Sequence, residues 1–289
     1  MPATSVRDLV IKDDDLVIGT HGRSFWILDD ITPLRQLANQ PTNQSTILYK
    51  PQNTYRVRWN MYPDTPVPQE EPSGQNPPDG AVINYYLNDN VNSISLEILD
   101  GKNNVVRRYS SADTMYKIGN VNIPHYWIRP QQILSPAAGS HRFMWDMHYT
   151  PLNVPPAYPI SATYMNTAPQ ATSPWVMPGM YTAKLTVNGK INTQVFEVKM
   201  DPRVKTGVKD LQQQHDLSLM CFNNIKKCMK KLEGLNENME AAKKLTAFIN
   251  KFKTIHGALQ ESDMVLKTQM IKETLETTVA FTQFYRSLK

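Results

Sequence analysis

The pattern of apolar and polar positions changes along the chain and divides it into segments. Residues 5–30 hold short unbroken apolar runs, residues 81–203 alternate between apolar and polar side chains, and beyond residue 204 apolar residues recur every three or four positions. The first two patterns indicate β-strands, and the third indicates amphipathic helices. The sequence therefore predicts a multidomain protein of mainly β structure followed by α structure, with segments at 1–33, 34–80, 81–203 and 204–289.

The first segment is predicted to form strands with apolar side chains on both faces. Leu16-Val17-Ile18 and Phe25-Trp26-Ile27-Leu28 are apolar runs on either side of a Gly-Thr-His-Gly turn, and one more strand, Val6 to Ile11, precedes them. Unbroken runs are typical of strands that are covered on both sides. Three strands cannot provide that cover for one another, so residues 1–33 are interpreted as part of a larger sheet.

Residues 34–80 are predicted to be an extended connector. Prolines recur between residues 51 and 78, where they remove backbone donors and fix φ, and one strand-like piece stands at Ile47-Leu48-Tyr49. Arg56 and Arg58 alternate with Tyr55 and Trp59. Nucleic-acid and glycan platforms use such residues, and so do connectors that anchor on their own domains. We favour the second interpretation and keep Trp59 as a candidate binding residue.

The alternating segment, residues 81–203, predicts a β-sandwich. Asn188-Gly189 is the preferred two-residue turn of a hairpin, and Trp145 stands in the middle of an alternating strand, where we expect it at the centre of the core. A shift of the apolar face between Thr193 and Phe196 predicts a β-bulge. About seven short strands of this kind are typical of an immunoglobulin-like or fibronectin-like sandwich.

The C-terminal segment, residues 204–289, predicts an antiparallel three-helix bundle. Apolar stripes run from Leu211 to Leu232 and from Ala242 to Phe252, and a third helix is predicted to be capped by Ser262 or Asp263. Two cysteines, Cys221 and Cys228, fall on the first of these helices. At that spacing a helix holds them too far apart for a disulfide, so they are predicted to be small packing residues.

The charge of the chain is unevenly placed. Residues 205–289 carry 14 Lys and Arg against 9 Asp and Glu, whereas residues 1–204 carry 17 of each, so the net charge of +5 belongs to the helices. Lysines at helical spacing opposite an apolar stripe are typical of solvated faces, and no nucleic-acid partner is predicted. No run of about eighteen apolar residues is present, so no membrane partner is predicted either. Met1 to Thr4 lack the features of a signal peptide.

Several motifs resemble those of one family: the large secreted bacterial proteins with sortilin-like, BNR-repeat β-propellers, often labelled glycosyl hydrolases. The motifs are Gly19-Thr20-His21-Gly22-Arg23, Trp26-Ile27-Leu28-Asp29-Asp30-Ile31, Pro77-Pro78-Asp79-Gly80, Tyr126-Trp127-Ile128-Arg129-Pro130 and Lys199-Met200-Asp201-Pro202-Arg203. The resemblance implies that residues 1–33 supply closing strands of the last propeller blade. It also implies that the chain is the C-terminal third of a secreted or periplasmic protein, with the upstream propeller as its partner.

The expected function follows from this resemblance. The sandwich segment is also similar to immunoglobulin-like modules of flagellar hook-capping proteins and secreted bacterial enzymes, which position or bind other domains. We therefore expect a non-catalytic accessory region that packs on a propeller or extends its binding surface toward a glycan or peptide. The alternative is a part of a glycoside hydrolase whose catalytic residues lie mostly upstream. Without the propeller, residues 5–30 are expected to self-associate or to be poorly ordered.

Candidates for chemistry are few. A glycosidase needs two carboxylates held across a sugar, but Asp29 and Asp30 are neighbours on a predicted strand and point to opposite faces. Asp146 and His148 are predicted to share a strand face and could hold a cation. No third ligand stands near them in the sequence, so neither a metal site nor a cofactor is predicted.

The glycine-rich turn supplies the remaining candidates. His21 and Arg23 could meet a ligand at the rim of a propeller, although a tight turn alone explains the two glycines beside His21. We keep His21 and Arg23, together with Trp59, Asp146 and His148, as candidate binding residues. No catalytic residue is predicted.

The first testable prediction concerns catalysis. The purified chain is expected to hydrolyse no aryl glycoside, because its strands offer no pair of facing carboxylates. The measurement is chromogenic turnover with a panel of aryl glycosides. Turnover that survives repurification and is lost on changing a single Asp or Glu would contradict the prediction.

Overall fold

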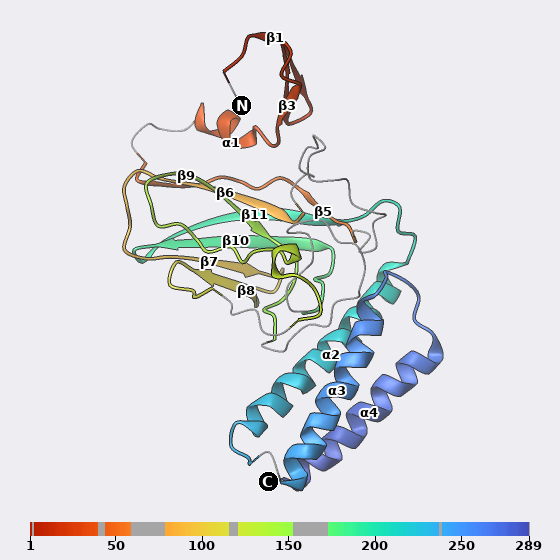
Figure 1. The fold of residues 1–289 in the computed structure, drawn as a ribbon. Coiled ribbons are helices and arrows are strands. Elements are labelled where there is room, and N and C mark those ends of the chain that lie inside the picture. The colour runs from red at the N-terminus through yellow and green to blue at the C-terminus, as the bar shows by residue number, and fades with distance from the viewer. Residues whose placement is uncertain are drawn as a thin grey trace.

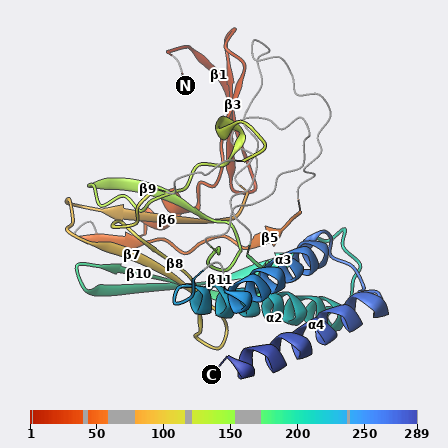
Figure 2. The ribbon, with the colours of Figure 1, turned by 60° about the horizontal axis from the view of Figure 1, so that its bottom comes forward.

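A computed structural model of the chain describes residue 1 and residues 3–39, 44–58, 79–115, 121–152, 173–236 and 239–288. These residues form three regions: an N-terminal sheet, a body of two larger sheets, and a group of C-terminal helices. The N-terminal sheet and the helices lie at opposite ends of the sheet body (Figures 1 and 2). Mixed β and α structure in this order was predicted, and the structure confirms it at that level.

The N-terminal sheet contains β1 (Val6–Lys12), β2 (Asp15–Thr20) and β3 (Phe25–Leu28), paired antiparallel in chain order. Tight turns join them: Asp13 adopts a φ of 54° in the first, and Gly22 and Ser24 adopt 70° and 65° in the second. The turn at Gly22 leaves room around its Cα and uses the left-handed conformation that glycine adopts readily. Helix α1 (Thr32–Leu37) follows this sheet.

The sheet body consists of a five-stranded and a three-stranded sheet. In spatial order the larger sheet holds β5 (Thr54–Arg56), β11 (Lys190–Met200), β10 (Gly179–Val187), β7 (Ile94–Leu99) and β8 (Val105–Ser110). The smaller sheet holds β4 (Thr46–Leu48), β6 (Ala81–Leu87) and β9 (Gly139–Trp145), and a 3-10 helix, η1 (His125–Trp127), lies between β8 and β9 in the chain.

Both sheets contribute side chains to one core, and Trp145 lies inside it. Trp145 is fully buried, and its ring centroid lies 5.3 Å from that of Tyr181 and 6.1 Å from that of Phe196 on the facing sheet. Its indole N–H donates to the His148 carbonyl at 3.0 Å, so the polar edge of the ring is satisfied. The predicted burial of Trp145 is confirmed, and Leu96, Ile98, Phe143 and Leu185 are buried in the same core.

The stretch predicted as a connector contributes strands to both sheets. β4 pairs antiparallel with β6 in the smaller sheet, and β5 pairs parallel with Val198–Met200 of β11 in the larger one. The chain therefore crosses from one sheet to the other between Leu48 and Thr54. Both strands have only three residues and prolines lie around them, which is why the sequence pattern indicated an extended link with a single strand-like piece.

The hairpin of β10 and β11 confirms one prediction and corrects another. Asn188 and Gly189 adopt φ values of 45° and 83°, as a two-residue turn of this type requires. The pairing runs without interruption from Val187 with Lys190 to Gly179 with Val198, so the predicted bulge is wrong. Instead Asn192 and Gln194 lie on the core side beyond the covered part of the sheet, and the apolar Ile191 and Val195 face outward.

The C-terminal region contains α2 (Val208–Leu232), α3 (Glu240–Gln260) and α4 (Thr268–Ser287), which share an apolar core around Phe252 and Phe281. Cys221 and Cys228 are both unpaired and fully buried there, as predicted, and burial raises the pKa of each thiol to about 12. The predicted cap of the third helix is wrong, because α4 begins at Thr268 and Asp263 has another partner.

Asp263 lies between α3 and α4. Its carboxylate forms ion pairs with Arg56 and Arg58, which belong to the stretch predicted as a connector. Leu275 of α4 is 44% exposed, whereas the polar Thr274 and Thr277 are buried. No helix among the described residues is long and apolar enough to cross a membrane.

The burial of Trp145 gives a stability prediction. Trp145→Ala should lower the free energy of unfolding by about 3–5 kcal/mol, because it removes a fully buried aromatic ring and leaves a cavity. Ile191→Ala, which changes a side chain that is 59% exposed on the same body, is the control and should cost less than about 0.5 kcal/mol. Denaturant unfolding measures both, and a loss below about 1 kcal/mol for Trp145→Ala would place the ring outside the core.

Candidate interaction surface

The strand register shows which side chains share each face of the N-terminal sheet. Leu9, Ile18 and Trp26 are aligned across the three strands, and Ile11, Leu16 and Leu28 are aligned beside them on the same face. The other face carries Val10, Val17 and Ile27 in one row and Phe25 next to them. Both faces are therefore apolar.

Neither face is covered by other described residues. Phe25 is 79% exposed, Ile27 61% and Leu9 54%, and every residue of β1 and β3 is exposed. None of the apolar core clusters of the described residues includes a residue of this sheet. An antiparallel sheet that stands in water normally has one polar face. These two apolar faces together form the candidate interaction surface.

The edges of this sheet are also without a strand partner in the described part of the chain. β2 is the central strand, and β1 and β3 each pair with β2 alone. The N–H of Leu9 donates to the side chain of Asp8 at 2.8 Å, so a local carboxylate serves one backbone donor of β1. Unpaired strand edges that carry apolar residues are ready to accept another strand.

One carboxylate joins this sheet to the rest of the protein. Asp30 Oδ1 accepts hydrogen bonds from the Thr32 N–H at 3.0 Å, the Thr32 hydroxyl at 2.5 Å and the Gln52 amide at 2.9 Å. Its second oxygen accepts from the side-chain amide of Asn84 in β6 at 3.2 Å. Asp30 thus connects the end of β3, the start of α1 and the smaller sheet of the body.

Further bonds at the same junction support Asp30. The guanidinium of Arg142 in β9 donates to the Asp29 carbonyl at 2.7 Å, and the Asp30 N–H donates to Asp15 Oδ1 at 2.9 Å. Arg35 of α1 forms an ion pair with Asp14 in the turn between β1 and β2. The predicted absence of an acid–base couple at Asp29 and Asp30 stays a prediction, but the structure gives Asp30 a definite structural role.

The structure places His21 and Arg23 together in the exposed turn between β2 and β3. The backbone N–H of His21 donates to the Ser5 carbonyl at 3.0 Å, and the Arg23 carbonyl accepts the indole N–H of Trp26 at 2.8 Å. The first bond continues the pairing of the β1 side with β2, the second lies within the turn, and both residues are exposed. Trp59 lies outside the described residues.

Asp146 and His148 do not form the cation site that their spacing suggested. The chain turns at Met147, which has a φ of 58°, so the two side chains do not continue one strand face. Asp146 Oδ1 accepts the His148 N–H at 3.1 Å, and the His148 ring lies 4.0 Å from the ring of Trp175. Within the described residues no group of three His, Cys, Asp or Glu side chains could hold a metal.

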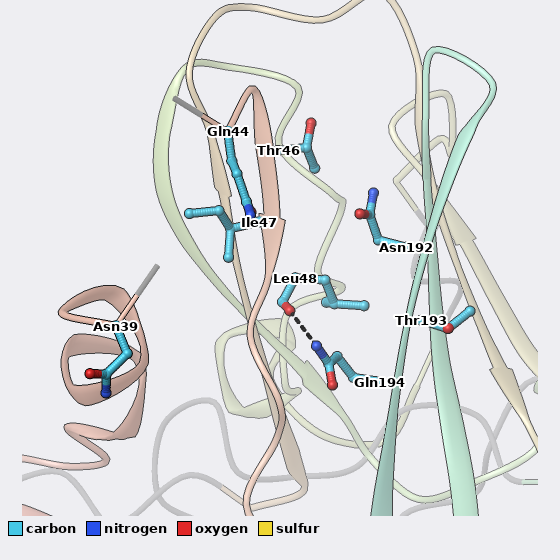
Figure 3. Close-up of a pocket in the computed structure, with 8 residues that line it drawn as sticks. All are labelled: Asn39, Gln44, Thr46, Ile47, Leu48, Asn192, Thr193 and Gln194. Atoms are coloured by element: carbon cyan, nitrogen blue, oxygen red, sulfur yellow. Dashed lines mark hydrogen bonds between the residues drawn. The ribbon is translucent and has the colours of Figure 1, made fainter. Parts of the chain in front are cut away.

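A polar cavity of about 360 Å³ opens between β4 and β11, at the edge of the two sheets (Figure 3). Its lining contains Asn39, Gln44, Thr46, Ile47, Leu48, Asn192, Thr193 and Gln194. Gln194 donates from its amide to the Leu48 carbonyl at 3.0 Å and so bridges the two strands. These side chains can form hydrogen bonds, but among them is neither a charged group nor an aromatic ring on which a sugar could stack.

Sequence reasoning missed both Asp30 and the amides of β11. Asp30 was considered only as half of a catalytic pair, although an Asp after a strand and two residues before a helix is a usual backbone acceptor. Asn192 and Gln194 were missed because the apolar residues near them, Ile191 and Val195, were expected to face the core. That expectation would have turned the two amides outward. A strict period of two from Tyr181 through the Asn188-Gly189 turn would have placed them correctly.

Comparisons with known proteins do not assign a family. No family model matches the chain, and no curated protein matches it. Among solved structures, CopC from Methylosinus trichosporium OB3b is similar over 55% of this chain and 98% of that chain, with 10% identity and a TM-score of 0.23. A likeness at that TM-score carries no argument about this chain, so the function is argued from the geometry.

The role of Asp30 can be tested by removing its carboxylate. Asp30→Gly keeps the positive φ of 58° accessible and should weaken the junction by about 1–3 kcal/mol, because several donors lose a charged acceptor. Hydrogen exchange of Thr32 and the α1 amides should accelerate accordingly. Asp29→Gly is the matched control, since only the backbone carbonyl of Asp29 is used by Arg142. Equal exchange rates in the two variants would contradict the role of the Asp30 carboxylate in joining the N-terminal sheet to the body.

Proposed function

We propose that the chain is a non-catalytic accessory region of a larger β-propeller protein, attached through its N-terminal sheet. One observation carries the proposal: β1–β3 form an ordered antiparallel sheet whose two apolar faces and two edges have no partner in the described residues. A sheet that is apolar on both faces fits a position in which other structural elements cover both of them. The resemblance of Gly19 to Arg23 and Trp26 to Ile31 to propeller proteins agrees with it.

A propeller blade supplies that kind of cover. Blades are typically four-stranded antiparallel sheets arranged around an axis, so each blade has neighbours on both faces. Three antiparallel strands joined by tight turns are one strand short of a blade. In this proposal a strand from the partner domain pairs with a free edge of the N-terminal sheet, and the adjoining blades cover its faces.

The energy available at this surface favours docking. Full burial of a large apolar side chain contributes about 1.5–3 kcal/mol, and the exposed side chains of β1 and β3 include Leu9, Val10, Ile11, Phe25, Ile27 and Leu28. Even partial burial of this set exceeds the cost of ordering a few side chains. The same surface should pair with a second copy when the propeller is absent.

The sheet body and helices would then position the partner. The strand order β5-β11-β10-β7-β8 facing β4-β6-β9 supports an immunoglobulin-like sandwich, in which the first strand divides between the two sheets. The three helices support the proposed bundle at the far end. Such a region extends a larger protein outward and carries binding surfaces rather than reacting groups. A secreted or periplasmic parent fits this proposal.

Sedimentation velocity of the full chain tests the exposed surface. The chain should self-associate, and Leu9→Gln, Phe25→Gln and Ile27→Gln introduced together should make it monomeric. The matched control changes three side chains of similar exposure on the outer face of the body: Met180→Gln, Ile191→Gln and Val195→Gln. This control should self-associate as the original chain does. Substitutions are preferable to deletion up to residue 81, which would also remove β4, β5 and Arg56.

Two results would overturn the proposal. One is a monomeric original chain whose residues 5–30 are strongly protected from hydrogen exchange, since the strands would then be satisfied within the chain. The other is a genomic sequence in which the reading frame upstream of Met1 lacks propeller repeats and no propeller protein binds the chain. Continuation of the frame into propeller repeats supports the proposal.

A further inference from the structure

The contact between the sheet body and the helices is built on a single buried carboxylate. Asp263 accepts a hydrogen bond from Arg56 Nη2 at 2.5 Å and from Arg58 Nη2 at 3.0 Å, and the Nε of Arg58 lies 2.9 Å from its second oxygen. The side chains of Arg56 and Asp263 are each 3% exposed. Arg56 also donates to the Val176 carbonyl at 2.7 Å, so one side chain holds both regions.

Polar groups of α3 complete this contact, which we term the joint. Gln260 accepts the backbone N–H of Trp175 at 2.9 Å and donates to the Ser218 hydroxyl of α2 at 2.7 Å, and its carbonyl accepts a hydrogen bond from Arg58. The guanidinium of Arg58 also lies 5.4 Å from the centre of the Trp175 ring. Hydrogen exchange of the Trp175 N–H therefore reports directly on the contact between the two regions, because its acceptor, Gln260, belongs to the helices.

His148 and His215 lie at the joint, and the charge of His256 interacts with that of His148. His256 of α3 is 5% exposed, and its buried Nε2 has no hydrogen bond. Nδ1 of His215 in α2 is buried without a hydrogen bond of good geometry, but it lies 3.6 Å from the carboxylate of Asp216. His215 Nε2 lies 3.2 Å from the Tyr149 hydroxyl of the body. His148, from the loop after β9, packs on Trp175 and bonds through Nδ1 to the Asp146 carbonyl at 2.7 Å.

Burial opposes protonation of all three rings, whereas the larger of the charges beside His148 and His215 favour it. Burial is the largest cause that lowers the pKa of each, and the pKa of His256 falls to about 4. Arg58 lowers the pKa of His148, Arg56 that of His215, and His148 that of His256. Asp146 and Asp79 act in the opposite direction on His148, as Asp216 does on His215, but they do not reverse the shift.

We propose that this joint is acid-sensitive: protonation of the buried rings of His148, His215 and His256 releases the helices from the sheet body. At neutral pH the joint holds two guanidinium groups and one carboxylate. Each added proton places a positive charge on a buried ring, where little water is available to screen it. Arg58 adds to this cost at His148, and Arg56 adds to it at His215. Separation of the two regions lets the histidines and arginines become hydrated.

The sign and size of the effect follow from linkage. A histidine whose pKa is lower in the closed state binds more protons when the joint is open, so closure weakens as the pH falls from about 6.5 toward 4. With pKa values of 6.5 when open and about 4 when closed, His256 alone raises the ratio of open to closed joint about twentyfold between pH 7 and pH 5. The carboxyls of Asp100, Asp201 and Glu273 have lowered pKa values and stay charged over this range.

Residue-resolved hydrogen exchange of the full chain tests the proposal. After correction for the intrinsic pH dependence of exchange, the Trp175 amide should exchange about twentyfold faster or more at pH 5 than at pH 7. Amides in the middle of β6 and β10 and far-UV circular dichroism should stay unchanged, which separates opening of the joint from unfolding. His21→Gln, in a turn far along the chain from the joint, is the control and should show the same rise as the original chain.

Two sets of variants make the outcome decisive. His256→Leu should reduce the increase in the Trp175 exchange rate at pH 5 about twentyfold. His148→Gln, His215→Gln and His256→Leu together should abolish that increase. Asp263→Asn should open the joint already at pH 7, which gives a second test if the triple variant does not fold. Exchange of Trp175 that is independent of pH from 7 to 5, or a rise unchanged by His256→Leu, would overturn the proposal.

Discussion

An apolar face must be covered, and the described residues meet this constraint in two regions of the protein but not in the third. The sheet body buries Trp145 and its neighbours between two sheets, and the helices bury Phe252 and Phe281 among themselves. The N-terminal sheet presents Phe25 and Ile27 on one face and Leu9 on the other, all exposed. The pairing of the strands combined with exposure of both faces is what supports the proposal that this sheet is an interaction surface.

Single carboxylates fix the positions of the three regions. Asp30 collects donors from α1, from Gln52 and from β6, and Asp263 collects Arg56 and Arg58. Both sets of bonds involve the stretch between residues 44 and 58. That stretch is therefore a structural centre of the molecule: it gives one strand to each sheet, and it contacts both the N-terminal junction and the helices.

Local sequence patterns predicted most helices and strands, but they did not predict contacts between residues far apart in the sequence. The Asn188-Gly189 turn, the burial of Trp145 and the stripes of α2 and α3 leave a period or a turn signal in the sequence. β4 and β5 are too short for a period, and Asp263 looks like a helix cap because its arginine partners stand more than 200 positions earlier. Of the candidate site, the apolar strands were predictable, but the hydrogen bonds of Asp30 to Gln52 and Asn84 depend on the assembled body.

The two junctions differ in their chemistry, and this decides how the regions can respond to their surroundings. The side chains that donate to Asp30 are hydroxyl and amide groups, which carry no charge at any pH near neutrality. The joint at Asp263 contains two arginines and lies beside buried histidines, and the proposed protonation of these histidines on opening would make it sensitive to pH between 7 and 5. The N-terminal sheet and the body should therefore behave as one unit across this range. The helices are the region that can change its position without disturbing the surface proposed to hold the partner.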